Sequence, residues 1–436
     1  MCSWRSPGTG LTVPGVTGPS PALPARSTAS YPVGTTPPGP ASLARGAGLV
    51  APALTAVNLV GYVLAVLAAR IFSKDSYGEF TALLGTLLVV SVPALALQAV
   101  VARSIARRPA GEPTGLRERA LLLRSAAVGL VVSGLVAAGS PLIAAFLHTS
   151  LAGPLWVAAQ LAPFAVLSAA MGILQGAERF PALAVVIGAQ AVGKAVGLVP
   201  LLLHRDPATV LAAFGVGTLL AMVLSLLLIG LSTGGSPPLA PLRLRDIAAA
   251  ASGLLGVLVL TNADLLLARN VLPGTESGHY SAGAVLAKMA FWLPQAVAVV
   301  VFPRLSDPTA GRGVLRRAVA LLAGLGLLEV LGCARLAGPA LSLTFGPGYE
   351  SLTRLAPLWV LQGASLAVVQ LLVYRAIAIH DSRTGQLVAA AVLVEVALIL
   401  ALRPQTTGPV ITVAAGVAVL LGLGLCLRSR VATKDA

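Results

Sequence analysis

Three basic residues stand inside long apolar segments of the sequence, namely Lys194, Lys288 and Arg375. A charge at the centre of a membrane helix costs about 2.5–3.5 kcal/mol on insertion scales, so it usually faces a cavity or a partner. Because a cation in a cavity can compensate a phosphate or pyrophosphate, these three are candidate substrate-binding residues. The alternatives are a structural ion pair for Lys194, and snorkelling of Lys288 and Arg375 to a membrane interface.

Further charged residues lie within or near the same apolar segments and are candidates for coupling or gating: Asp264, Arg269, Glu329 and Glu395. Asp264 and Arg269 are five residues apart near one end of a segment, which favours a gate or an interface salt bridge over ion binding. Glu329 and Glu395 could balance the charge of one central cavity that Lys194 and Lys288 would share.

Motifs of enzymes and cofactor sites are not found in this sequence. It contains no GxSxG, HExxH, P-loop or dinucleotide fingerprint. Its three cysteines show no CxxC spacing. We therefore expect a protein that is not an enzyme and that holds no cofactor and no metal.

The composition explains where these residues must sit. Hydrophobic residues make up 57% of the 436 residues and charged residues only 10%, whereas a soluble domain carries roughly 25% charged residues. The net charge of +15 does not indicate nucleic acid, because aromatics are only 4% and the basic residues lie in short segments between apolar runs. The chain is expected to be an all-α integral membrane protein.

Twelve segments are long enough to span a bilayer, which takes about 20 apolar residues. They are residues 46–69, 80–102, 121–147, 153–174, 182–203, 208–231, 247–268, 281–303, 314–337, 355–378, 385–402 and 408–427. The first 44 residues are rich in proline and glycine and are expected to form a disordered cytoplasmic tail. The domain prediction is a bundle at 45–231, a cytoplasmic linker at 232–246, a second bundle at 247–427 and a tail at 428–436.

The basic residues also predict an orientation. With a cytoplasmic N-terminus, 20 of the 30 basic residues lie on the inner side and 7 lie in outer connections. Because cytoplasmic loops carry the excess of Lys and Arg, both termini are expected in the cytoplasm.

The two predicted bundles repeat each other at an offset of about 200 residues. Arg70, Gly78, Pro93 and Arg103 in the first half recur in order as Arg269, Gly278, Pro294 and Arg304. Six helices per half give both halves the same orientation, so the repeats are parallel and related by an axis along the membrane normal. We expect two parallel six-helix bundles around a central cavity.

Several short motifs resemble those of a known superfamily. Residues 68–72 (AARIF), 171–180 (MGILQGAERF), 264–269 (DLLLAR), 278–280 (GHY) and 302–306 (FPRLS) carry the resemblance. They look like the multidrug/oligosaccharidyl-lipid/polysaccharide exporter superfamily, in particular its polysaccharide (O-antigen-type) flippase branch, which is related to lipid II flippases. Two features of lipid II flippases are missing here, namely two extra C-terminal helices and arginines in the first helix.

The resemblance implies export of a lipid-linked oligosaccharide, a precursor of polysaccharide or cell wall, by alternating access across the bacterial cytoplasmic membrane. The partners it implies are the lipid-linked sugar pyrophosphate, membrane lipids, and the polymerase and glycosyltransferases of the same process. The alternatives are a lipid II flippase, a multidrug or cation antiporter of the same superfamily and, from another class, a membrane glycosyltransferase or polymerase.

Overall fold

The computed structural model describes residues 40–106, 116–230, 255–292, 311–378 and 381–431. All regular elements in these residues are helices. The first bundle contains α1 (Pro40–Ile71), α2 (Lys74–Val90), α3 (Val92–Ala106), α4 (Leu116–Leu147), α5 (Ala152–Gly176), α6 (Phe180–Val196), α7 (Leu198–Leu202) and α8 (Pro207–Ile229). The second contains α10 (Ala263–Val271), α11 (Gly274–Trp292), α13 (Gly311–Phe345), the 3-10 turn η1 (Glu350–Leu352), α14 (Ala356–Ala378), α15 (Ser382–Leu402) and α16 (Thr407–Val431).

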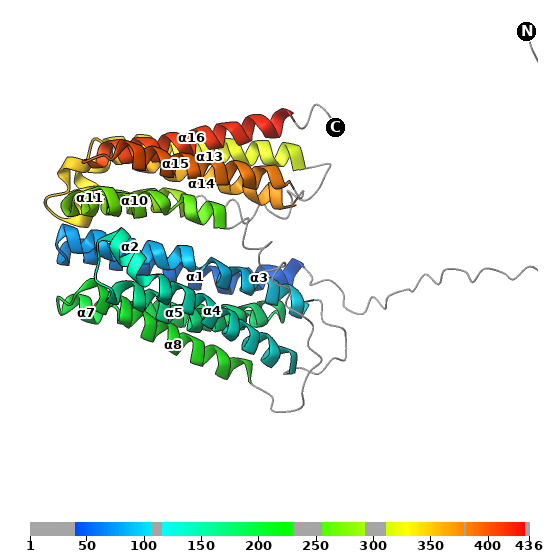
Figure 1. Ribbon diagram of the computed structural model, residues 1–436. Helices are drawn as coiled ribbons and strands as arrows, with labels where there is room; N and C mark the ends of the chain where they lie inside the picture. The colour runs from blue at the N-terminus through cyan, green and yellow to red at the C-terminus, as the bar shows by residue number, and fades with distance from the viewer. Residues whose placement is uncertain (1–39, 107–115, 231–254, 293–310, 379–380, 432–436) are drawn as a thin grey trace, which may run out of the picture.

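Figure 1 shows the two bundles as separate layers, with α1–α8 below and α10–α16 above. Among the described residues, ten helical stretches are long and apolar enough to cross a membrane. They correspond to ten of the twelve expected spans. The other two, 247–268 and 281–303, lie partly outside the described residues. The predicted tails at 1–44 and 428–436 also lie largely outside them, and the predicted linker at 232–246 lies wholly outside them.

The outer surface of the bundles is apolar. Leu135, Leu142, Leu343 and Leu420 are each at least 69% exposed. In water such a surface would be unstable, whereas lipid tails solvate it. The exposed leucines therefore agree with the membrane location expected from composition.

Inside the bundles, small residues let helices approach closely. A Cβ on Gly172 would lie 2.6 Å from the Gln98 carbonyl of α3, and one on Gly176 would lie 2.4 Å from the Ala102 carbonyl. This pair, four residues apart, places α5 directly on the backbone of α3. Such small-residue stripes are how membrane helices gain packing energy without a hydrophobic driving force.

Two helices begin earlier than expected. α2 starts at Lys74, because the Ser73 hydroxyl accepts a hydrogen bond from the Ser76 amide at 3.2 Å and caps the helix. α11 starts at Gly274. The glycines of the repeat, expected in outer turns, therefore lie inside helices, and the turns themselves are only two residues long.

Candidate functional site

Hydrogen bonds between the two bundles gather at one end of the molecule. Among the described residues, they all involve positions 69–81, 146–148, 269–281 and 343–349. We call this the sealed end. It lies on the left of Figure 1, opposite the C-terminus.

Two arginines of the repeat perform matching roles at the sealed end. Arg269 of α10 donates to the carbonyls of Leu147 at 2.9 Å and His148 at 3.1 Å, at the end of α4. Arg70 of α1 donates to the carbonyl of Thr344 at 2.7 Å and to that of Leu343, at the end of α13. Each guanidinium thus binds carbonyls that a helix C-terminus leaves unpaired, where the helix dipole favours a cation.

The two arginines differ in their surroundings. Arg269 is only 5% exposed and forms an ion pair with Asp75 of the other bundle at 2.5 Å. Arg70 is exposed. The Arg269 guanidinium is therefore the better shielded of the two, although its partner Asp75 is 62% exposed.

The first turns of α2 and α11 cross at the centre of the sealed end. The hydroxyls of Thr81 and Ser281 lie 2.6 Å apart. A Cβ on Gly278 would lie 2.0 Å from the backbone carbonyl of Lys74, and one on Gly78 would lie 2.4 Å from the Ser277 hydroxyl. Equivalent positions of the two repeats thus touch each other, as expected near a twofold axis between parallel repeats.

A cluster of polar side chains surrounds Asp264 inside the second bundle. Asp264 is 3% exposed. Its Oδ2 accepts hydrogen bonds from the Tyr280 hydroxyl at 2.7 Å and from Gln362 Nε2 at 2.9 Å. Its other oxygen, Oδ1, is buried and has no hydrogen-bond partner among the residues that the structure describes. A buried carboxyl with one free oxygen can still accept a proton or contact a cation.

Two more charged groups act on Asp264. Lys288 of α11 interacts with it electrostatically, and so does Glu395 of α15, which is 1% exposed and whose Oε1 has no hydrogen-bond partner within the described ranges. Lys288, Asp264 and Gln362 line a small cavity of about 20 Å³, which is close to the space that one water molecule needs. The cluster brings two of the expected acids and one expected cation together.

Lys194 lies in a different cavity, within the first bundle. This cavity has a volume of about 290 Å³, and its largely apolar lining includes the polar side chains of Ser91, Gln160, Gln190 and Thr218. A Cβ on Gly61 of α1 would lie 4.0 Å from the Lys194 ammonium, so the glycine leaves room for it. Within the described part of the chain, Lys194 has no hydrogen-bond partner. The two lysines therefore do not share a cavity in this conformation, unlike the arrangement expected from the sequence.

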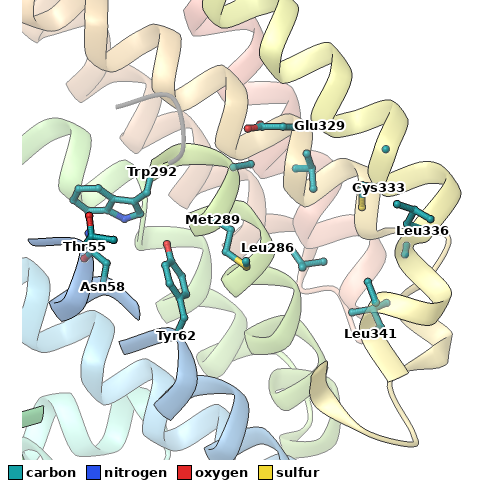
Figure 2. A pocket seen from close by; sticks show the side chains of 15 residues that line it. Thr55, Asn58, Tyr62, Leu286, Met289, Trp292, Glu329, Cys333, Leu336 and Leu341 are labelled. Carbon is teal, nitrogen blue, oxygen red and sulfur yellow. The ribbon is translucent and has the colours of Figure 1, made fainter. Parts of the chain in front are cut away.

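A third cavity, of about 630 Å³, lies between the bundles and is lined by α1, α11, α13 and α14. Glu329 of α13 lines it, and both of its carboxylate oxygens are enclosed without a hydrogen-bond partner in the part of the chain that the structure describes. Figure 2 shows Thr55, Asn58, Tyr62 and Trp292 on one side of this cavity and Cys333, Leu336 and Leu341 on the other. Glu329 thus faces neither lysine.

Arg375 lies in the last turn of α14 and is half-buried. Three partners of these charged groups, Asp75, Tyr280 and Gln362, were not predicted from the sequence. Tyr280 follows from the repeat, because it occupies the place of Phe80 in the first half. Asp75 and Gln362 show no local pattern that distinguishes them, since their partners are 194 and 98 residues away in the chain.

Comparisons with known proteins agree with this architecture. A family model described as polysaccharide biosynthesis protein matches residues 43–308. No curated protein sequence matches the chain. Among solved structures, the lipid II flippase MurJ in an inward closed conformation has a TM-score of 0.66 at 14% identity, over 88% of this chain and 87% of that one.

Two other structures show the same fold. An inward-facing multidrug resistance MATE family transporter has a TM-score of 0.62 at 13% identity, over 88% of this chain and 96% of that one. A transporter from Pyrococcus furiosus, described as having a binding pocket of reverse polarity, has a TM-score of 0.60 at 15% identity, over 90% and 96% of the two chains. The expected fold is confirmed, since the chain shares the fold of these transporters.

With the family model covering more than half of its length, this multi-pass membrane protein belongs to the polysaccharide biosynthesis protein family.

Proposed function

We propose that this protein is a flippase that moves a lipid-linked oligosaccharide across the bacterial cytoplasmic membrane by alternating access. The observation that carries the proposal is the family match over residues 43–308 in a chain whose two bundles are joined by hydrogen bonds at one end. Opening that end while closing the other would expose an enclosed ligand to each side in turn.

The two lysines support a substrate that carries negative charge. A lipid-linked sugar bears a phosphate or pyrophosphate, and crossing hydrocarbon requires a compensating cation. Lys194 offers an ammonium without a partner among the described residues, in a cavity large enough for such a group. Lys288 lies beside Asp264 and would become available when that carboxyl is neutralised.

The cluster at Asp264 and Glu395 is the proposed coupling element. Two buried carboxyl groups close to one another resist being charged together, so binding a proton or a cation there would be favourable. The charges of Asp264 and Lys288 would then respond to that binding. Coupling predicts that transport by Asp264→Asn and Glu395→Gln variants loses its dependence on an ion gradient.

The orientation from the basic residues places the sealed end on the outer face and both termini in the cytoplasm. In that orientation the cavities would load from the cytoplasmic side. The natural partners are the glycosyltransferases that build the substrate on the inner leaflet and the polymerase that consumes it on the outer leaflet.

Deleting the gene tests the proposal. Lipid-linked oligosaccharide should accumulate on the cytoplasmic leaflet and surface polymer should fall, and the wild-type gene should restore both. An unchanged leaflet distribution together with altered drug resistance would instead support a multidrug or cation antiporter. Accumulation of lipid II alone would support a lipid II flippase, and loss of oligosaccharide synthesis without inner-leaflet accumulation would support a glycosyltransferase or polymerase.

A further inference from the structure

The cavity between the bundles has two chemically different sides. One side carries the hydroxyl of Thr55, the amide of Asn58, the phenol of Tyr62 and the indole of Trp292 (Figure 2). The other side is formed by α13 and is apolar apart from Glu329, with Cys333, Leu336, Ala337, Ala340 and Leu341. An amphipathic lining of this kind fits an amphipathic ligand.

The polar side is built by helix periodicity. Thr55, Asn58 and Tyr62 are separated by three and four residues, so they share one face of α1. Among the described residues, neither the Asn58 amide nor the Tyr62 hydroxyl has a hydrogen-bond partner. Polar groups on a membrane helix normally find partners within the protein or in a water-filled space. These two are therefore available to a ligand with several hydroxyl groups.

Trp292 adds a flat apolar surface beside these polar groups. It is the last residue of α11 and its side chain is 43% exposed. An indole offers a broad apolar face and a single N–H donor. The combination of one aromatic face with amide and hydroxyl groups suits a sugar ring, whose C–H face is apolar and whose edge carries hydroxyls.

The distance of the lining residues from the sealed end predicts where the sugar and the lipid chain of a ligand would lie. At about 1.5 Å per residue, Asn58, Thr55 and Trp292 lie about 20, 24 and 27 Å from the sealed end, Tyr62 about 14 Å and Leu341 only about 6 Å. Glu329 lies at the polar depth, about 24 Å from the end of α13, and no described residue donates a hydrogen bond to either of its oxygens. A sugar at this level would supply hydroxyl donors, while an acyl or prenyl chain would contact the leucines.

We propose that this cavity is a subsite for the uncharged saccharide of a glycolipid, with Trp292 stacking on one ring, Asn58 and Tyr62 binding hydroxyls along the saccharide, and α13 holding the lipid chain. The choice of ligand rests on the proposed function, but the site is separate from the cavity that contains Lys194. The phosphate and the sugar of one substrate would then be recognised by different groups.

Tryptophan fluorescence tests the site, because two tryptophans of nearly equal exposure form a matched pair. Trp292 lines the cavity, while Trp156 of α5 is 44% exposed and is not among the lining residues. The full chain in lipid nanodiscs would carry either Trp4→Phe with Trp156→Phe, or Trp4→Phe with Trp292→Phe. The buried Trp359 remains as the same background in both.

Octyl β-maltoside is the probe, added at concentrations below those that dissolve the nanodiscs. Only the variant retaining Trp292 should show a saturable change in emission, and octyl phosphate and octanol should give none. Asn58→Leu should weaken binding by about five- to tenfold, the size expected for a lost hydrogen bond. Asn58→Gln should retain part of the maltoside affinity.

An equal response of both variants would mean partition into the lipid and would overturn the subsite. Saturation by octyl phosphate instead of the maltoside would overturn its assignment to an uncharged sugar. Maltoside binding at Trp292, in a protein whose deletion leaves lipid-linked oligosaccharide distribution unchanged, would retain the subsite and reject the flippase function. No maltoside response at Trp292, in a protein whose deletion does change the distribution of lipid-linked oligosaccharide, would retain the flippase function and reject the subsite.

Discussion

Arg269 and Asp75 form an ion pair of 2.5 Å that joins the two bundles, although they are 194 residues apart in the chain. The same guanidinium also binds two carbonyls at the end of α4. One side chain therefore connects three helices across the boundary between the repeats. If the sealed end opens during transport, these bonds must break in every cycle.

Cysteine cross-linking tests that opening. In a background lacking Cys2, Cys333 and Cys426, Thr81→Cys with Ser281→Cys should form a disulfide, because the native oxygens lie 2.6 Å apart. Oxidation should abolish transport in reconstituted vesicles and reduction should restore it. Unimpaired transport by the fully cross-linked protein would exclude opening at this end.

The contribution of Arg269 can be measured with the same cysteine pair. Arg269→Gln should slow cross-linking about tenfold, equal to ~1.4 kcal/mol of lost sealing, because hydrogen bonds of a charged group are worth about 1.5–3 kcal/mol. Arg70→Gln is the matched control. Arg70 is the equivalent arginine of the first repeat and is exposed, so its loss should slow cross-linking less. Equal effects would mean that burial and the Asp75 partner are unimportant.

Gly278 provides a steric test. Alanine at this position would place its Cβ 2.0 Å from the Lys74 carbonyl, so the sealed end could not close. Transport should be lost while the protein still inserts into the membrane. Gly324→Ala on α13 is the control, because nothing lies within 4 Å of its Cβ and its activity should be unchanged. Normal transport by Gly278→Ala would contradict the observed crossing.

The lysines should be required for transport but not for folding. Lys194→Ala should abolish export in reconstituted vesicles with the protein amount unchanged, and arginine should rescue it better than glutamine. Lys288→Ala also leaves the Asp264 carboxyl without a nearby cation. The double variant Lys288→Ala/Asp264→Asn removes that carboxyl charge and is therefore the comparison for Lys288→Ala. Full transport by the double variant Lys194→Ala/Lys288→Ala would reject their proposed role in binding substrate.

The orientation is tested with an impermeant thiol reagent in intact cells. Single cysteines at Arg108, Ser236 and Gly311 should be shielded, and those at Ser76 and Gly274 should react. The expected pattern follows from the distribution of basic residues. A reversed pattern would place the sealed end in the cytoplasm and would require the proposed direction of loading to be reversed.

Acid should loosen the start of α15 and its contact with α16. Burial raises the pKa of the Asp381 carboxyl, but hydrogen bonds from Thr384, Arg383 and Arg428 outweigh it and hold the pKa below its ordinary value. The ion pair with Arg428 is 3.0 Å long. Its stabilisation is therefore present above the unfolded pKa of about 3.9 and is lost as pH falls through the folded value. For this partly exposed pair we expect about 0.5–1 kcal/mol, seen as a lower melting temperature that Arg428→Gln reproduces at pH 7.

The sequence predicted the fold better than it predicted the site. Apolar length and the repeat of Arg70 and Gly78 as Arg269 and Gly278 led to the correct fold, because these signals are local or come twice. The contacts of Asp75 and Gln362 could not be predicted, since they depend on how helices distant in sequence rotate toward one another. For the same reason Lys194 and Lys288 were expected in one cavity, whereas the structure places them in two.

The contact between Thr81 and Ser281 also bears on how such a chain could arise. If one gene encoded a single six-helix bundle before duplication, two copies would have paired through an isologous interface, in which a residue on the axis meets its own counterpart. A hydroxyl suits that place because it can donate and accept at once, whereas a charge would repel itself. After fusion the two positions could diverge, as Thr and Ser have, while the ancestral requirement for self-pairing remains visible in their chemistry.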